Sequence, residues 1–240
     1  MKEILKFRQS VKEFCSKYDM IITPVVRFIL YLIMYMTLNS MTGYSTAFGS
    51  TKVAVLMAVI SAVTSDGIGL GLGALLLTGQ LFSANVEIGA VFLLLFLVLY
   101  CAYIRFFPKA SWIILFMPFF YIIKFQYFMP ILAGMTAGFT GMVPAAFGCI
   151  FYFFLKHTAD YVALSSSSAE GYKYIFQHLV QDKTLLLTII VFAVVIVLTY
   201  IIYRMSFAYS WYVAIITGGV VEIILFLVGT LSMEVEVSLA

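Results

Sequence analysis

Five charged side chains fall within, or at the edges of, long apolar runs of the sequence. They are Arg27, Asp66, Glu87, Lys124 and Glu222. A charge at the centre of a bilayer costs about 2.5–3.5 kcal/mol even on lenient insertion scales, so such residues usually face a cavity, another helix or a partner. We therefore take these five as candidates for a substrate or ion pathway, or for polar contacts between helices.

Four of the five also have a simpler structural interpretation. Arg27 and Glu87 lie close enough to the end of an apolar run to reach an interface, and Lys124 can snorkel to one. Asp66 lies at an interruption of its run, where its carboxylate could cap a half-length helix. Glu222 lies near the middle of the last run, so we expect it to be protonated, paired, or facing a cavity or a partner subunit.

The sequence contains none of the catalytic or cofactor-binding motifs that we sought. His157 and His178 are far apart in the chain, and neither has a cysteine or a second histidine at ligand spacing. The glycine-rich stretch 66–71 lacks the Gly-Lys-Ser/Thr that follows in a phosphate-binding loop. The three cysteines form no disulfide or zinc-site pattern. We therefore expect a protein that is not an enzyme and that has no cofactor and no metal site.

The composition identifies the class of protein. Hydrophobic residues make up 64% of the chain and charged residues 10%, against about 45–50% and 25% in soluble domains. So few charges cannot cover a soluble surface of this size, and the net charge of +3 is too small to favour nucleic-acid binding. The composition predicts an all-α polytopic membrane protein.

Five apolar runs are long enough, or nearly so, to cross a hydrocarbon core, which takes about 20 residues. These predicted full transmembrane helices are 20–41, 88–104, 111–128, 184–203 and 209–231.

Two further apolar segments, 53–82 and 129–155, are each too long for one span and too short for two. Glycine weakens a helix by about 1 kcal/mol and proline lacks the N–H donor, so we expect each segment to break and form a hairpin. The residues that we assign to the two interruptions are Gly67, Gly69, Gly141 and Pro144.

An internal repeat is also predicted. An offset of 75 residues aligns the two broken segments, pairing Ser65 with Thr140 and Gly73 with Gly148. Each broken segment lies between two spans, which gives weak repeats at about 20–104 and 111–203 within a single transmembrane domain, 20–231.

The charge distribution predicts the orientation. Residues 1–19 are expected to form a basic amphipathic helix in the headgroup plane on the cytoplasmic side. If both broken segments are hairpins, Arg105, Lys109 and Arg204 are also cytoplasmic. The polar segment 157–183 and the acidic tail 232–240 are then exterior. The expected location is the plasma or inner membrane.

These features favour an integral membrane subunit of a transport or permease-type system, which binds or moves a small solute or ion near the two broken helices. The alternative is a non-transporting structural or regulatory subunit of a membrane secretion or assembly complex. Both interpretations imply contact with membrane lipid and with other protein subunits, in a homo- or hetero-oligomer, and neither involves nucleic acid.

Overall fold

The computed structural model describes residues 18–107, 110–164, 171–207 and 209–233. Throughout these residues the regular structure is helical, which confirms the predicted all-α class. The predicted amphipathic helix over 1–19 falls almost entirely outside the described residues. The same holds for Lys109, for the serine run at 165–168 and for most of the acidic tail.

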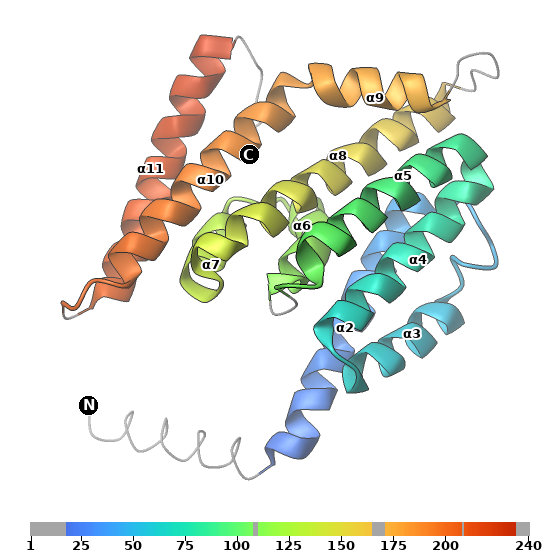
Figure 1. The fold of residues 1–240 in the computed structure, drawn as a ribbon, viewed down its shortest axis with the longest axis horizontal. Helices are drawn as coiled ribbons and strands as arrows, with labels where there is room; N and C mark the ends of the chain where they lie inside the picture. Colours follow the sequence, from blue (N-terminus) through green and yellow to red (C-terminus); the bar gives the residue numbers. More distant parts are fainter. Residues whose placement is uncertain (1–17, 108–109, 165–170, 208, 234–240) are drawn as a thin grey trace.

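The helices follow one another closely along the chain (Figure 1). In order they are α2 (Asp19–Thr42), α3 (Thr51–Val63), α4 (Asp66–Ala84), α5 (Val86–Leu99), a π-helical turn η1 (Tyr100–Ile104), α6 (Trp112–Ile122), α7 (Phe128–Thr136), a 3₁₀ turn η3 (Gly138–Gly141), α8 (Met142–Ala163), α9 (Gly171–Gln181), α10 (Lys183–Tyr203) and α11 (Ser210–Met233).

Six helical segments are long and apolar enough to cross a membrane. They are Met20–Thr42, Asp66–Ala84, Val86–Ile104, Gly138–Ala163, Lys183–Tyr203 and Ser210–Met233. Four of them match predicted spans. The other two arise because the second halves of the broken segments continue beyond the apolar runs, to Ala84 and Ala163, and become full-length helices.

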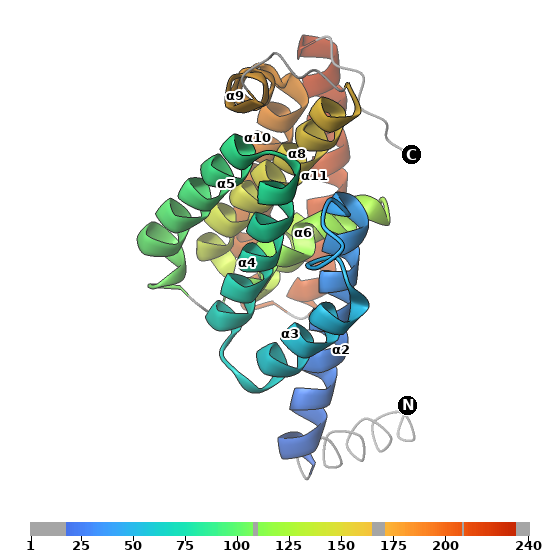
Figure 2. The same cartoon turned by 90° about the vertical axis from the view of Figure 1, so that its right-hand side faces the viewer.

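The bundle has two ends, which we name from α2. The proximal end contains the start of α2, and the distal end contains its last residue, Thr42. The helices α3 and α4 form a hairpin that enters from the distal end, turns at the proximal end and returns. Because α3 has only 13 residues, it does not reach back to the distal end. The stretch between Gly43 and Ser50 covers the rest of that distance. In Figures 1 and 2, α10 and α11 lie side by side at one edge of the bundle.

The predicted span 111–128 is wrong. Its helix, α6, has 11 residues and ends at Ile122, so it rises only about 16 Å, roughly half of a hydrocarbon core. The chain then turns and descends as α7, which has 9 residues. The start of α6 and the end of α7 line one pocket, through Trp112 and Thr136 among others. The two helices therefore form a hairpin that starts and finishes at the proximal end.

The tip of this α6–α7 hairpin lies beside the middle of two long helices. Tyr121 stacks on Tyr152 of α8 with 3.9 Å between ring centroids, and Tyr127 meets Phe226 of α11 edge-on at 5.2 Å. The mid-depth interruption of the fold is therefore at residues 123–127, within a run that the sequence analysis treated as one continuous span.

The two predicted interruptions exist, but both lie at the proximal end and slightly before the predicted residues. The first is at Thr64 and Ser65, so Gly67 and Gly69 belong to the first turns of α4. The second is the η3 turn, where the hydroxyl of Tyr103 donates to the carbonyl oxygen of Thr140.

Two of the residues assigned to the second interruption differ in their position. Gly141 is the last residue of η3, whereas Pro144 is the third residue of α8. At that position the missing N–H has no acceptor within the helix, so proline is tolerated there without breaking it. Gly138, which the sequence analysis did not single out, takes a φ of 62°, a left-handed conformation that favours glycine.

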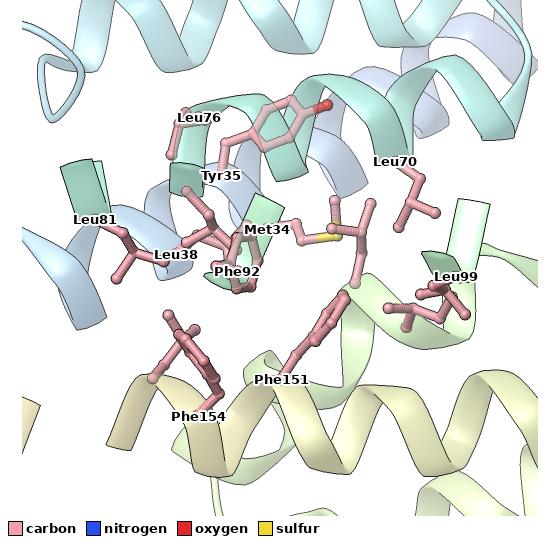
Figure 3. Close-up of a cluster of buried hydrophobic side chains, with 14 of the residues drawn as sticks. Met34, Tyr35, Leu38, Leu70, Leu76, Leu81, Phe92, Leu99, Phe151 and Phe154 are labelled. Carbon is pink, nitrogen blue, oxygen red and sulfur yellow. The ribbon is translucent and has the colours of Figure 1, made fainter. Parts of the chain in front are cut away.

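The larger hydrophobic core joins α2, α4, α5, α6 and α8 (Figure 3). Phe92 of α5 packs against Phe151 and Phe154 of α8, with ring centroids 5.2 and 5.5 Å apart. The side chain of fully buried Gln80 on α4 forms hydrogen bonds with two residues of α2. Its amide nitrogen donates to Asn39, and its carbonyl oxygen accepts from the hydroxyl of Thr42 at 2.7 Å. Large exposed hydrophobic side chains cover the outer faces of α2, α3, α5 and α11.

The described part of the polar segment 157–183 lies at the distal end and contains α9. His157 Nε2 lies 3.1 Å from a carboxylate oxygen of Asp182, and the other carboxylate oxygen accepts from the N–H groups of Thr184 and Leu185. Asp182 thus caps the start of α10 and fastens it to α8, which fixes the turn between α9 and α10.

Candidate functional site

Two of the five predicted residues meet at the first interruption. Arg27 of α2 places Nη2 3.3 Å from Oδ1 of Asp66, and its Nη1 donates to the carbonyl oxygen of Thr64 at 3.2 Å. Thr64 caps the end of α3, and Asp66 begins α4. One guanidinium therefore ties both sides of the interruption to α2.

Two tyrosines on the same face of α2 continue this network. The Tyr31 hydroxyl donates to Oδ1 of Asp66 at 3.4 Å. The Tyr35 hydroxyl donates to the carbonyl oxygen of Gly69 at 2.8 Å and lies 2.6 Å from the hydroxyl of Ser61. A Cβ on Gly69 would lie 2.6 Å from the Tyr31 ring, so this glycine allows α4 to approach α2 closely.

The charged and polar groups of this network find partners within the chain, which is the pattern of a structural junction. The cap position of α4 is occupied by Ser65, and Asp66 is the first helical residue. The predicted capping role of Asp66 is therefore wrong. Its carboxylate instead pairs with Arg27, in the helix's first turn, where negative charge is favourable.

Glu222 has a different environment. Its side chain comes from the middle of α11 and is buried, with 3% of the residue exposed. The carboxylate oxygen Oε1 is shielded from solvent and has no hydrogen-bond partner in the described part of the chain. A buried polar atom without a partner costs about 1–3 kcal/mol, so a fold retains it only when something else favours it.

Glu222 lines a pocket of about 510 Å³ between the tip of the α6–α7 hairpin and α11. Most of the described lining is aromatic or aliphatic, and Glu222 is the single charged side chain among those residues. The lining residues are Phe125, Tyr127, Phe128, Ile131, Gly219, Glu222, Ile223 and Phe226. The size falls within the range of small-molecule sites, which are typically about 300–1,000 Å³.

Lys124 shapes this pocket through the backbone. It takes a left-handed φ of 56°, its N–H donates to Tyr121 O, and the N–H of Phe125 donates to Phe120 O. These two bonds form the Schellman motif that ends many helices, in which glycine usually occupies the left-handed position. The motif turns the chain so that Phe125 and Phe128 reach the pocket. The Lys124 side chain is exposed and is not part of the lining.

Two further buried polar atoms without a partner lie near the hairpin. They are Oε1 of Gln126, in the tip, and Oγ1 of Thr199 on α10. A Cβ on Gly218 would lie 2.8 Å from that Thr199 oxygen and 3.2 Å from Ile131, which also lines the pocket. The Thr199 hydroxyl thus faces the same Gly218 position as Ile131, and Gln126 lies between the lining residues Phe125 and Tyr127 in the chain.

Glu87 lies apart from both sites. It is an exposed residue in the first turn of α5, at the distal end, where its N–H donates to the cap residue Asn85 at 2.8 Å. Its exposed position at one end of the bundle fits the simpler interpretation, that Glu87 reaches an interface. Negative charge is also favourable in the first turn of a helix.

Several residues of both sites were missed by the sequence analysis. Tyr31 and Tyr35 follow the predicted residue Arg27 at every fourth position, which places all three on one helix face, and this signal was present in the sequence. The aromatic pocket wall carries no such signal, because Tyr127, in the hairpin turn, and Phe226, on α11, meet only through the unpredicted turn at Lys124.

The described residues contain no group of three His, Cys, Asp or Glu side chains that could hold a metal ion. The pocket offers one carboxylate and a set of aromatic rings, which together suit a ligand that is partly apolar and carries a donor or a positive charge. No protein-family description, curated protein or solved structure matches this chain.

Proposed function

We propose that this chain is an integral membrane protein that binds a small solute or ion at Glu222, as the membrane-embedded subunit of a transport or permease-type system. The observation that carries the proposal is the partnerless carboxylate oxygen of Glu222, which lines a pocket at the tip of the α6–α7 hairpin. Ionisable residues at membrane depth are expensive, and they commonly mark solute and ion pathways.

The shape of the hairpin supports the same proposal. Two half-length helices that meet at mid-depth leave backbone groups at the turn between residues 123 and 127. Such irregular backbone is tolerated inside a bilayer only where protein or a water-filled cavity surrounds it. Interrupted helices of this kind form binding sites in many secondary transporters, which is an analogy of architecture.

We place the proximal end on the cytoplasmic side. The basic stretch 1–19 directly precedes α2, and the three described arginines Arg27, Arg105 and Arg204 belong to this end. The distal end holds Lys173 and Lys183 together with the acids Glu87, Asp160 and Asp182. The bias of basic residues towards the cytoplasm supports this orientation.

Reconstitution into liposomes tests the transport role. Solute-induced currents on a supported membrane, together with an internal pH dye for electroneutral exchange, are measured for inorganic cations, organic cations, neutral polar solutes and organic anions. At least one class should give a signal above that of protein-free liposomes. Glu222→Gln should abolish it, whereas Glu87→Gln, a matched change at the distal end, should retain it. The absence of a signal from every class would refute the transport role.

A non-transporting subunit of a membrane complex is the second candidate. It is favoured by the complete pairing of the Arg27–Asp66 junction and by the exposed apolar face of α11, which a partner could cover as readily as lipid. In that case Glu222→Gln would leave co-purification of the native assembly unchanged while no solute signal appears in the wild type.

A further inference from the structure

We infer that the solute bound at Glu222 is a hydrophobic organic cation, such as an amine or quaternary ammonium compound with apolar substituents. This inference rests on the proposed function and specifies the ligand of the same pocket. It follows from three properties of the site, namely its charge, its aromatic wall and its size.

The charge of the pocket selects a cation or a strong donor. Glu222 is the one charged side chain of the lining, and Arg or Lys is absent from it. No ion pair with Glu222 occurs among the described residues, and its Oε1 lacks any hydrogen bond. A positively charged ligand would supply the missing partner, and a charge-assisted bond is about twice as strong as a neutral one. An anionic ligand would face an uncompensated carboxylate.

The aromatic wall selects an organic rather than an inorganic cation. Phe125, Tyr127, Phe128 and Phe226 all line the pocket, and the faces of such rings attract ammonium groups, with a contribution that rises when water is excluded. A divalent metal ion needs about six oxygen ligands, which the one carboxylate of the described lining does not provide. Removing a small hydrated ion from water against four rings would be costly, whereas an alkyl or aryl cation gains from the same contacts.

The size of the pocket fits a molecule of this class. Its volume of about 510 Å³ is far larger than the roughly 30 Å³ of a water molecule. The wall formed by α11 is open at Gly219, since a Cβ there would meet no atom within 4 Å. A larger side chain at this position would project into the pocket without displacing its neighbours, so Gly219 provides a way to block the site and leave Glu222 unchanged.

Binding of tetraphenylphosphonium to the full-length protein in lipid nanodiscs tests the inference. The anion tetraphenylborate serves as a ligand of the same shape and opposite charge, and protein-free nanodiscs correct for partition into lipid. The wild type should bind the phosphonium saturably and should not bind the borate. Glu222→Gln and Gly219→Leu should each weaken binding by about tenfold or more, because each removes one selecting property. Glu87→Gln should leave binding within about twofold, since an exposed distant charge contributes little.

The outcomes separate this inference from the proposed function. Equal binding of phosphonium and borate, or phosphonium binding that neither variant weakens, would overturn the inference. The inference would also fail, with the proposed function intact, if liposomes show a Glu222-dependent signal for sodium or a neutral solute and none for organic cations. If no class of solute gives a Glu222-dependent signal or binding, both fail. Retention of the wild-type elution profile and helical content by each variant shows that a loss of binding is not a loss of folding.

Discussion

Nη2 of Arg27 on α2 lies 3.3 Å from Oδ1 of Asp66, the first residue of α4. The same guanidinium donates to the carbonyl oxygen of Thr64, within the interruption. The side chains are partly exposed, 37% for Arg27 and 29% for Asp66, so their surroundings screen the pair. The junction therefore contributes to the geometry of the α3–α4 turn more than to overall stability.

A double-mutant cycle measures the worth of this pair. Arg27→Met and Asp66→Asn should each lower the free energy of unfolding by about 1 kcal/mol, with a coupling of about 0.5–1 kcal/mol between them. Unfolding in mixed detergent micelles gives both values. Additivity of the two single variants would contradict a direct interaction. Solute binding at Glu222 should stay unchanged in all three variants, because the junction lies away from that pocket.

The left-handed backbone at Lys124 predicts an unusual ranking of two substitutions. Lys124→Gly and Lys124→Ala both remove the ammonium group, but only glycine relieves the strain of a φ of 56°. The glycine variant should therefore be more stable than the alanine variant by about 1 kcal/mol. Thermal unfolding in detergent measures the difference, and Lys124→Arg should match the wild type. An alanine variant as stable as the glycine variant would show that this position is not left-handed.

Close packing of the hairpin on α10 gives a further test. A Cβ on Gly134 would lie 2.9 Å from the carbonyl oxygen of Ile196 and 3.0 Å from Cβ of Thr199. Gly134→Ala should therefore destabilise the protein by about 1–3 kcal/mol, because backbone must shift to admit the methyl group. Gly71→Ala is the matched control in α4. No atom lies within 4 Å of its Cβ position, so it should stabilise the helix by about 0.5–1 kcal/mol. Equal effects of the two changes would argue against close contact of α7 with α10.

Much of the fold follows from the sequence, and what does not follow has a physical cause. Four predicted spans are helices with ends within a few residues of the predicted ones, because uniform apolar runs leave little choice. The run 111–128 was predicted as one span because it is apolar on both sides of Lys124. A glycine at this left-handed position would have indicated the end of a helix, but a lysine does not. Glu222 was identified because its charge is conspicuous in an apolar run. Its pocket was not, since the four aromatic rings come from two segments, 125–128 and α11, which meet only after the hairpin turns.

Cysteine labelling from the two sides of the membrane tests the orientation and the hairpin together. In a background without Cys15, Cys101 and Cys149, single cysteines replace Glu87, Arg105 and Phe139. Exposed Glu87 lies at the distal end and the other two lie at the proximal end, where Tyr103 contacts Thr140. Impermeant reagent should therefore label Glu87→Cys from outside, and Arg105→Cys and Phe139→Cys only after the cytoplasmic side is opened. Labelling of Arg105→Cys and Phe139→Cys from opposite sides would mean that the α6–α7 segment crosses the membrane.

The stability of Glu222 variants distinguishes a binding carboxylate from a structural one. Methionine has a similar size and no polar atom, so Glu222→Met removes the partnerless Oε1 without leaving a large cavity. If the carboxylate serves a ligand, the ligand-free protein should become more stable by about 1–3 kcal/mol, because replacing an unsatisfied buried polar group with an apolar one of similar shape removes its desolvation cost. The same variant should lose all phosphonium binding. This pairing of gained stability with lost binding is the trade-off expected where a site is retained for function.

If Glu222 instead stabilises the bundle through a partner, Glu222→Met should lower the free energy of unfolding by several kcal/mol, as breaking a buried charged pair does. Unfolding and binding measured on the same preparation therefore decide between the two roles.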